Sequence, residues 1–241
     1  MTRAVVMASW NDVPHLTAQQ KADMLASYPP HQRKARSEGI PQLGSGAIYP
    51  LDESEFRVTP FQLPKHWPRA YALDVGWRRT AALWGAWDRD TGVCYLYSEH
   101  YRGEAEPAIQ AAAIRARGAW IPGVVDPSAR GRNAIDGARL LEMLTDLGLV
   151  LTKAVNSVES GLFDVWQKLS AGQIKVFSNL ENFFTEYRLY RRDEKGAVVK
   201  QNDHLMDCLR YLIVSGYAVA QIPQAPTRAR PVRSLRDSTG V

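Results

Sequence analysis

Asp203, His204 and Asp207 begin a helix-like segment near the end of the chain, in the stretch NDHLMDCLRY. Asp203 and Asp207 are four residues apart, and at about 100° per residue they share one face of a helix. Two carboxylates stacked in this way repel each other, so a cation beside them would stabilise the pair. Alternatively, Asp203 caps the helix at the positive end of its dipole and Asp207 pairs with Arg210. The segment alone leaves both interpretations open.

Two further acids lie at the ends of apolar, strand-like runs. Asp74 ends the run RAYALD, and Asp126 ends the run IPGVVD. An unpaired carboxylate is costly to bury in such surroundings, and a divalent cation would stabilise it. Each acid also has a local alternative, because Asp74 could cap a tight turn at DVG and Asp126 could form a turn in VDPS.

The order of strands and helices predicts how these acids meet. The run that contains Asp74 is followed by two β-rich runs joined by the turn residues Asp88 to Gly92, which indicates a hairpin. Strands then alternate with helices, which favours parallel pairing. We therefore expect an α/β fold, a mixed sheet of three antiparallel strands and then parallel strands, flanked by helices. In that sheet Asp74 and Asp126 lie on neighbouring strands. The expected helices are EPAIQAAAIRARG, NAIDGARLLEMLTDLG, SGLFDVWQKLSAG and NLENFFTEYRLY, and the expected later strands are IPGVVD, LVLTKA and IKVF.

Composition narrows the class of protein. The chain has 241 residues, of which 45% are hydrophobic, so it is long enough to bury a core. Its net charge of +5 suits a polyanionic partner without identifying one. Cys94 and Cys208 form no CxxC pair and no zinc-ligand spacing, so we expect two reduced, buried thiols. No apolar run reaches the ~20 residues that cross a bilayer, so a cytosolic protein is expected.

The three separated acids predict a metal site. Hard cations such as Mg²⁺ or Mn²⁺ prefer carboxylate oxygens, and phosphoryl transfer often uses two ions about 3.5–4 Å apart. Asp74, Asp126 and Asp203 would be the ligands, with Asp207 as a helper. His204 is turned by roughly 100° from Asp203 around the helix, so proton transfer or phosphate contact is a minor prediction for it.

Basic side chains near these acids are candidates for DNA contact. Such contacts position DNA without reading its bases, and they weaken as salt rises. Each candidate has the alternative of being a solvated loop residue. The candidates are Arg130 and Arg132 in the loop after Asp126, Lys200 before the helix, and Arg191, Arg192 and Lys195 in a small predicted hairpin. The aromatic residues Trp77, Trp84, Trp87 and Trp166 fall in core-like patterns, and we expect them to pack inside the protein.

Several stretches together resemble one family. These are YPPHQRKARSEGIPQLGSGAIYPL, YALDVGW, VVDPSARGRNAIDG, NSVESGLFDVW and GQIKVFSNLENFFTEYRLYRRDEKGAVVKQNDHLMDCLRYLI. In this order they are similar to the nuclease region of the large terminase subunit of tailed bacteriophages. The likeness extends over most of the chain, to about Ile222.

The resemblance implies an RNase H-like fold and a metal-dependent endonuclease that cuts concatemeric double-stranded viral DNA during genome packaging and leaves a 3′-hydroxyl. By position, Asp74 matches the family's first acid, Asp126 the second, and Asp203 the acid of the DHxxD helix. Asp207 matches a later acid, and the sequence does not decide whether Asp203 or Asp207 binds metal more closely. The implied cofactor is Mg²⁺ or Mn²⁺, with two ions. The implied partners are DNA, the portal protein and the small terminase subunit, in the host cytoplasm and transiently at the procapsid portal.

The expected organisation has three parts. Residues 1–46 form a linker or docking arm with a helix from about Thr17, residues 47–222 form the nuclease domain, and residues 223–241 form a basic, disordered tail. A GxxxxGK[ST] phosphate loop is absent, so ATP-driven translocation is not expected of this chain, which resembles the part that follows a motor. Two alternatives stay open. One is another RNase H-like nuclease, such as a Holliday-junction resolvase, and the other is a non-catalytic DNA-binding or capsid-docking module.

Overall fold

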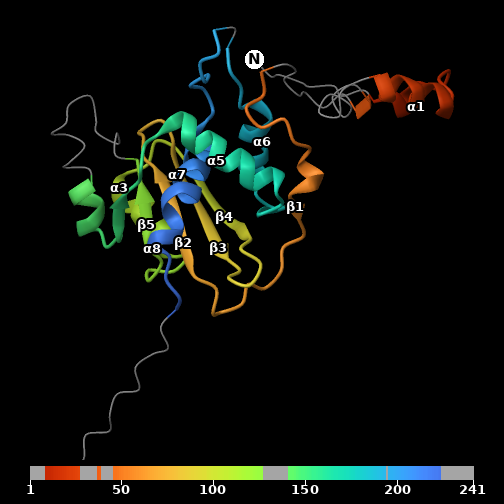
Figure 1. Cartoon of the computed structure of the whole chain (residues 1–241). Coiled ribbons are helices and arrows are strands. Elements are labelled where there is room, and N and C mark those ends of the chain that lie inside the picture. Colours follow the sequence, from red (N-terminus) through yellow and green to blue (C-terminus); the bar gives the residue numbers. More distant parts are fainter. Residues whose placement is uncertain (1–8, 28–36, 39–45, 127–140, 194, 224–241) are drawn as a thin grey trace, which may run out of the picture.

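The central feature of the fold is one mixed sheet (Figure 1). The structure, a computed structural model, describes residues 9–27, 37–38, 46–126, 141–193 and 195–223. Seven strands form a sheet in the order β1-β7-β4-β3-β2-β5-β6. They are β1 (Arg57–Val58), β2 (Arg69–Asp74), β3 (Thr80–Trp87), β4 (Cys94–Arg102), β5 (Gly123–Val125), β6 (Leu151–Lys153) and β7 (Ile174–Phe177).

The predicted pairing of the strands is confirmed. β2 and β3 pair antiparallel, as do β3 and β4, whereas β5 pairs parallel to β2. β7 pairs parallel to β4 on the other side of the hairpin, and the two-residue β1 extends that edge. The sheet is therefore the expected mixture of three antiparallel strands and parallel strands.

Helices cover both faces of the sheet. The helices that pack on the sheet are α3 (Pro107–Arg115), α5 (Val158–Ser170), α6 (Glu181–Leu189), α7 (His204–Tyr211) and α8 (Tyr217–Val219), together with a helical segment at 141–146. The further helix α1 (Ala18–Ser27) is drawn away from the sheet in Figure 1. α7 continues into a π-helical turn at Leu212–Gly216. Figure 1 shows α5 and α7 lying across the sheet. The part of the predicted helix at 133–148 that precedes residue 141 lies outside the described residues.

Successive side chains of β2 point to opposite faces of the sheet, and this explains why two cores form. Ala70 and Ala72 face a core shared with α5, α6 and α7, whereas Tyr71 and Leu73 face a core shared with α3 and the segment 141–146. Because successive side chains of a strand point to opposite faces, a strand buried on both sides is apolar throughout. Asp74 breaks that apolar run at the end of the strand, where the chain leaves the sheet.

Two of the four tryptophan predictions are wrong. Trp84 and Trp87 are buried in the sheet as expected, but Trp77 is 65% exposed and Trp166 is 40% exposed. Trp77 lies in the turn after β2, beyond the last residue that the sheet covers. Trp166 lies on the outer side of α5, where its ring packs beside Phe163.

Several smaller expectations are also settled by the described residues. Cys94 and Cys208 are free thiols and both are buried, as predicted. The small hairpin expected near residues 191–200 is reduced to an isolated bridge between Arg192 and Val198. Among the helices in the described ranges, none has both the length and the apolar character needed to cross a membrane.

Candidate active site

Asp74 and Asp126 lie side by side at one edge of the sheet. Leu73 pairs with Val125 where β2 and β5 run parallel, and the residue that follows each of them in the chain is an acid. The backbone N–H of Asp126 points to the carbonyl oxygen of Leu73 at 3.4 Å. The carboxyl ends of neighbouring parallel strands meet at the same edge, which is why this pair could be predicted.

Helix α7 adds a third polar group to this edge. The Nδ1 atom of His204 lies 2.7 Å from Oδ2 of Asp74. Burial raises the pKa of Asp74, and the hydrogen bond and charge of His204 partly offset that rise. The nearby negative charges of Asp207 and Asp126 raise the pKa of Asp74 further. Asp74, Asp126, His204 and Asp207 therefore lie together, and this group of side chains, with Asp203, is the carboxylate pocket. His204, a minor prediction, is part of it.

The first turn of α7 is capped by another helix. Asp203 occupies the N-cap position, but its side chain makes no capping hydrogen bond. Instead, the Leu205 N–H donates to Oε2 of Glu186 on α6 at 2.6 Å, and Oε1 of Glu186 accepts from the Tyr101 hydroxyl at 2.6 Å. Side-chain capping by Asp203, one of the two sequence-based alternatives, is therefore contradicted.

Both acids of α7 lie against cations of this chain. The Lys200 ammonium is 3.1 Å from Oδ2 of Asp203 and 3.1 Å from Oδ2 of Asp207. Arg210, which is almost fully buried, donates to Oδ1 of Asp207 at 2.9 Å, so this expected pair is confirmed. The stacked carboxylates thus have the neighbouring positive charge that their spacing requires.

Arg210 links the two halves of the pocket. Its Nη1 donates to Oδ1 of Asn156 at 3.1 Å, and the Asn156 amide lies 3.5 Å from Oδ1 of Asp126. Tyr211 also reaches Asp126 through its hydroxyl. The side chains that surround Asp126 are therefore held by the same helix that carries the other acids.

The donor set suits a hard divalent cation. The pocket offers carboxylate oxygens, as Mg²⁺ and Mn²⁺ prefer. Both cysteine thiols are buried, and that of Cys208 donates to the Ala81 carbonyl. Oδ2 of Asp203 is buried and accepts no hydrogen bond in the described part of the chain, although Lys200 is in ionic contact with it. Across the described ranges, no three His, Cys, Asp or Glu side chains are already arranged around one ion position. The residues therefore fit such an ion by the chemistry of their oxygens.

Comparison with known proteins identifies the family. The family model of the terminase RNaseH-like domain matches residues 72–215, which include Asp74, Asp126, Asp203 and Asp207. The chain belongs to this family. The predicted resemblance and the RNase H-like fold are thereby confirmed.

Two relatives of this chain are large terminase subunits. The chain is 34% identical over 246 residues to the large terminase subunit of Salmonella phage P22, a match that covers 98% of this chain and 47% of the relative. It is 35% identical over 221 residues to that of Enterobacteria phage LP7, which covers 87% of this chain and 46% of the relative. The chain thus spans about half the length of these relatives.

Solved structures agree with these matches. The nuclease domain of the P22 large terminase superposes with a TM-score of 0.70 and 31% identity, over 74% of this chain and 96% of that domain. The large terminase of a thermophilic bacteriophage superposes with a TM-score of 0.60 and 25% identity, over 85% of this chain and 54% of that protein.

The predicted DNA-contact residues of this family member have different surroundings. Arg130 and Arg132 lie outside the described residues. Lys200 contacts the acids of α7. Arg192 forms an ion pair with Glu159 at 2.6 Å. Arg191 and Lys195 are exposed. Their contact with DNA stays a prediction.

Sequence reasoning missed four polar groups that hold the pocket: Tyr101, Asn156, Glu186 and Tyr211. Glu186 had a detectable signal, because it lies three residues after Phe183 on the buried face of an aromatic helix. A carboxylate in that position needs a partner, but the sequence does not say which one. Asn156 and Tyr211 gave no comparable signal, since each depends on a contact across the fold.

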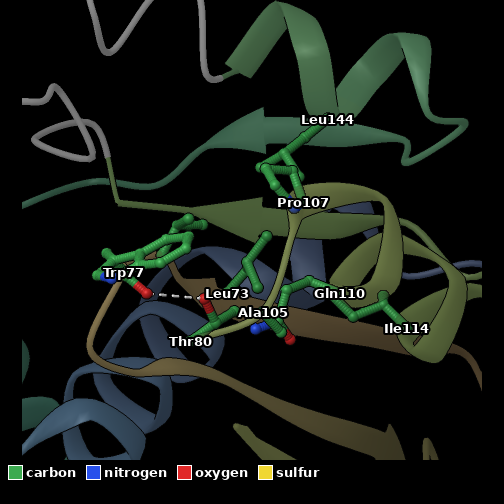
Figure 2. Close-up of a pocket in the computed structure, with 10 residues that line it drawn as sticks. Leu73, Trp77, Thr80, Ala105, Pro107, Gln110, Ile114 and Leu144 are labelled. Atoms are coloured by element: carbon green, nitrogen blue, oxygen red, sulfur yellow. Dashed lines mark hydrogen bonds between the residues drawn. The ribbon is translucent and has the colours of Figure 1, made fainter. Parts of the chain in front are cut away.

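An apolar cavity of about 200 Å³ lies beside the same edge of the sheet. Figure 2 shows Leu73, Trp77, Pro107, Ile114 and Leu144 around it. Its polar lining groups already have partners in the protein: the Thr80 hydroxyl donates to the Gly76 carbonyl, and Gln110 contacts His100 and Arg102. None of the described residues that line the cavity is an acid, so we place the chemistry at the carboxylate pocket.

Proposed function

We propose that this chain is the nuclease part of a phage large terminase, a Mg²⁺- or Mn²⁺-dependent endodeoxyribonuclease that cuts concatemeric double-stranded DNA during genome packaging. The observation that supports it is the meeting of Asp74 and Asp126 on the sheet with Asp203 and Asp207 on α7. Membership in the terminase RNaseH-like family supports the same reaction class.

Asp74 and Asp126 are the residues that would hold a divalent ion, with Asp203 and Asp207 on the helix side. When bound, such an ion lowers the pKa of an attacking water and stabilises charge on the leaving oxygen of the phosphodiester. The binding of two ions stays a prediction. It depends on whether Asp203 and Asp207 can bind the second ion.

The remaining pocket residues orient these acids. His204 fixes one oxygen of Asp74 by its 2.7 Å contact. Asn156 and Tyr211 approach Asp126, and Arg210 fixes Asp207. Oriented ligands matter because a displaced carboxylate loses much of its catalytic benefit. The chain's contribution is thus a rigid arrangement of oxygens at one edge of a sheet.

The proposed partners follow from the family. DNA phosphates would be held by the basic candidates Arg130, Arg132, Arg191, Arg192, Lys195 and Lys200, so binding should weaken with salt. The portal protein and the small terminase subunit would be the protein partners, in the host cytoplasm and at the procapsid portal. Residues 47–222 would form the nuclease domain, 1–46 a linker after a motor, and 223–241 a basic tail.

Plasmid cleavage tests the proposal directly. The parent chain should cut DNA with Mg²⁺ or Mn²⁺ and stop when EDTA is added. Asp74→Asn should abolish cutting while DNA binding, measured by gel shift without metal, persists. Asp90→Asn, which changes an exposed acid in the β3–β4 turn, should cut like the parent. Full cleavage by Asp74→Asn would refute the assignment of the site.

Two comparisons separate the alternatives. A preference for four-way junctions over linear duplex would indicate a junction resolvase. DNA binding with no cutting, and a melting temperature that Mn²⁺ leaves unchanged, would indicate a non-catalytic module.

A further inference from the structure

The turn between β2 and β3 carries an exposed indole close to the carboxylate pocket. Trp77 is 65% exposed, and it lies three residues after Asp74, the last residue of β2. Three residues span at most ~11 Å, so the backbone of Trp77 lies within that distance of Asp74. One strand of DNA advances about 3.4 Å per nucleotide. The turn is therefore within about three nucleotides of a phosphodiester bound at Asp74.

The backbone of this turn is held by the residues that follow β4. The Glu104 N–H donates to the Trp77 carbonyl oxygen at 2.9 Å. A Cβ atom at Gly103 would clash with the Arg78 carbonyl oxygen, so a larger residue there would displace the turn. Glu104 has a φ of 51°, a conformation that is uncommon for residues other than glycine and that is frequent at functional sites. Trp77 and Arg78 are thus presented on a preformed turn.

Two arginines follow the indole, and their surroundings differ. The guanidinium carbon of Arg79 lies 4.4 Å from the centre of the Tyr101 ring, and the Tyr101 hydroxyl donates to Glu186. Arg78 is exposed, and within the described ranges no acid forms an ion pair with it. Arg79 therefore fastens the turn to the residues that hold α7, whereas the guanidinium of Arg78 is available to bind a phosphate.

Packing does not account for the indole of Trp77. Its ring lies beside the apolar cavity, yet most of its surface faces solvent. Among the described aromatic rings, none pairs with that of Trp77, whereas the exposed ring of Trp166 packs beside Phe163. A flat apolar ring that faces solvent can stack on a nucleobase, in single strands or as a wedge between the base pairs of a duplex.

We propose that the β2–β3 turn is a DNA-contact element, in which the Trp77 indole stacks on a base within about three nucleotides of the cut and Arg78 binds a phosphate. This role rests on the proposed nuclease function, because the cut is placed at Asp74. Stacking is an apolar contact and phosphate binding is an ionic one, so the two residues should respond differently to salt.

DNA binding without metal separates the two contacts. Binding of a short duplex by the full chain in EDTA is measured by fluorescence anisotropy at several salt concentrations. Trp77→Ala should bind about tenfold more weakly at every salt concentration, the loss typical of one stacked base. Arg78→Met should lower the slope of log K against log salt by about 0.9, the change for one phosphate contact. Trp166→Ala and Arg89→Met, at an exposed indole of α5 and an exposed arginine of the β3–β4 turn, should match the parent.

Photocrosslinking tests the stacking contact itself. A duplex with 5-bromouracil in place of thymine should crosslink to the peptide of the parent that contains Trp77, and this measurement needs no variant. Crosslinks confined to other peptides would overturn the proposal. A parent-like affinity of Trp77→Ala, or a parent-like slope of Arg78→Met, would overturn it as well.

Controls keep the possible failures apart. Melting temperatures show whether each variant is folded. Equal losses of affinity in Trp77→Ala and Trp166→Ala would show that the effect does not belong to this turn, and would also overturn the proposal. If the parent binds DNA but does not cut it, the nuclease function fails, while the salt slopes and the crosslinks still decide whether the turn contacts DNA.

Discussion

The imidazole of His204 joins α7 to β2, because its Nδ1 atom lies 2.7 Å from Oδ2 of Asp74. This contact raises the pKa of His204, chiefly through the hydrogen bond to Asp74. Burial at the same time raises the pKa of Asp74. Both groups therefore hold protons more tightly in the folded chain than in the unfolded chain, and this sets the direction of a pH effect.

Metal-free protein should lose stability as the pH rises through the raised pKa of His204. A group whose pKa is higher in the folded state stabilises the fold below its unfolded pKa and loses that contribution above the folded value. The window therefore begins near 6.5, the ordinary value for histidine, and extends upward. Melting temperatures in EDTA should therefore fall as the pH rises above that value. The His204→Ala variant should show a flatter profile.

A second histidine controls for general pH effects. His66 is exposed, and His66→Ala should keep the parent's slope. If His204→Ala falls with pH as steeply as the parent does, the contact with Asp74 contributes nothing to this dependence.

Glu186 should be required for the start of α7. Its carboxylate is 2% exposed and accepts the Leu205 N–H and the Tyr101 hydroxyl. Glu186→Ala leaves both donors buried without an acceptor. Each lost hydrogen bond should lower the free energy of unfolding by about 2 kcal/mol. Glu186→Gln keeps one acceptor oxygen and should lose less. Urea unfolding measures both.

The catalytic consequence separates capping from plain packing. Glu186→Ala should raise the Mn²⁺ concentration needed for half-maximal cleavage, because α7 carries Asp203 and Asp207, whereas Glu186→Gln should stay close to the parent. Glu181→Ala, at an exposed residue in the first turn of α6, serves as the control. Equal defects in the Ala and Gln variants would show that the charge of Glu186, and not its acceptor role, is what matters.

The sequence correctly predicts that the two acids at the ends of neighbouring strands lie together. Asp74 and Asp126 end apolar runs, and strand order alone places them together. The partners of α7 could not be predicted in this way. The sequence suggests DNA contact for Lys200 and capping as one role for Asp203. In the structure the Lys200 ammonium lies beside Asp203 and Asp207, and Glu186 accepts the Leu205 N–H. Spacing along the chain does not show these contacts, because they join groups that only the fold brings together.

The tryptophans show a related limit. Trp77 ends the stretch YALDVGW, which is apolar except for Asp74, and Trp166 lies in an amphipathic helix, so both have the sequence pattern of core residues. Exposure depends on where the sheet ends and on which side of α5 the core lies, and these are properties of the assembled fold. The local hydrophobicity of the sequence gives no information about where the sheet ends or which side of α5 faces the core.

Arg210 should be among the costliest residues to replace. It is 1% exposed and pairs with Asp207 and Asn156, so Arg210→Met leaves the poorly solvated carboxylate of Asp207 with only the Lys200 ammonium as a cation. Removing one partner of a buried ion pair costs about 3–5 kcal/mol. Arg192→Met breaks a more exposed pair with Glu159 and should cost about 0–1 kcal/mol. Similar losses for the two variants, measured by urea unfolding, would contradict the buried role of Arg210.

Trp77 and Trp84 form a final matched pair, because one is 65% exposed and the other is fully buried. Trp84→Ala removes a ring from the centre of β3 and should lower the free energy of unfolding by about 3–5 kcal/mol. Trp77→Ala removes mostly solvated surface, so the change should stay within about 0.5 kcal/mol. A large loss for Trp77→Ala would mean that its indole is covered by another part of the protein. Because Trp77 lies three residues after Asp74, cleavage by this stable variant also reports whether the exposed ring contacts DNA.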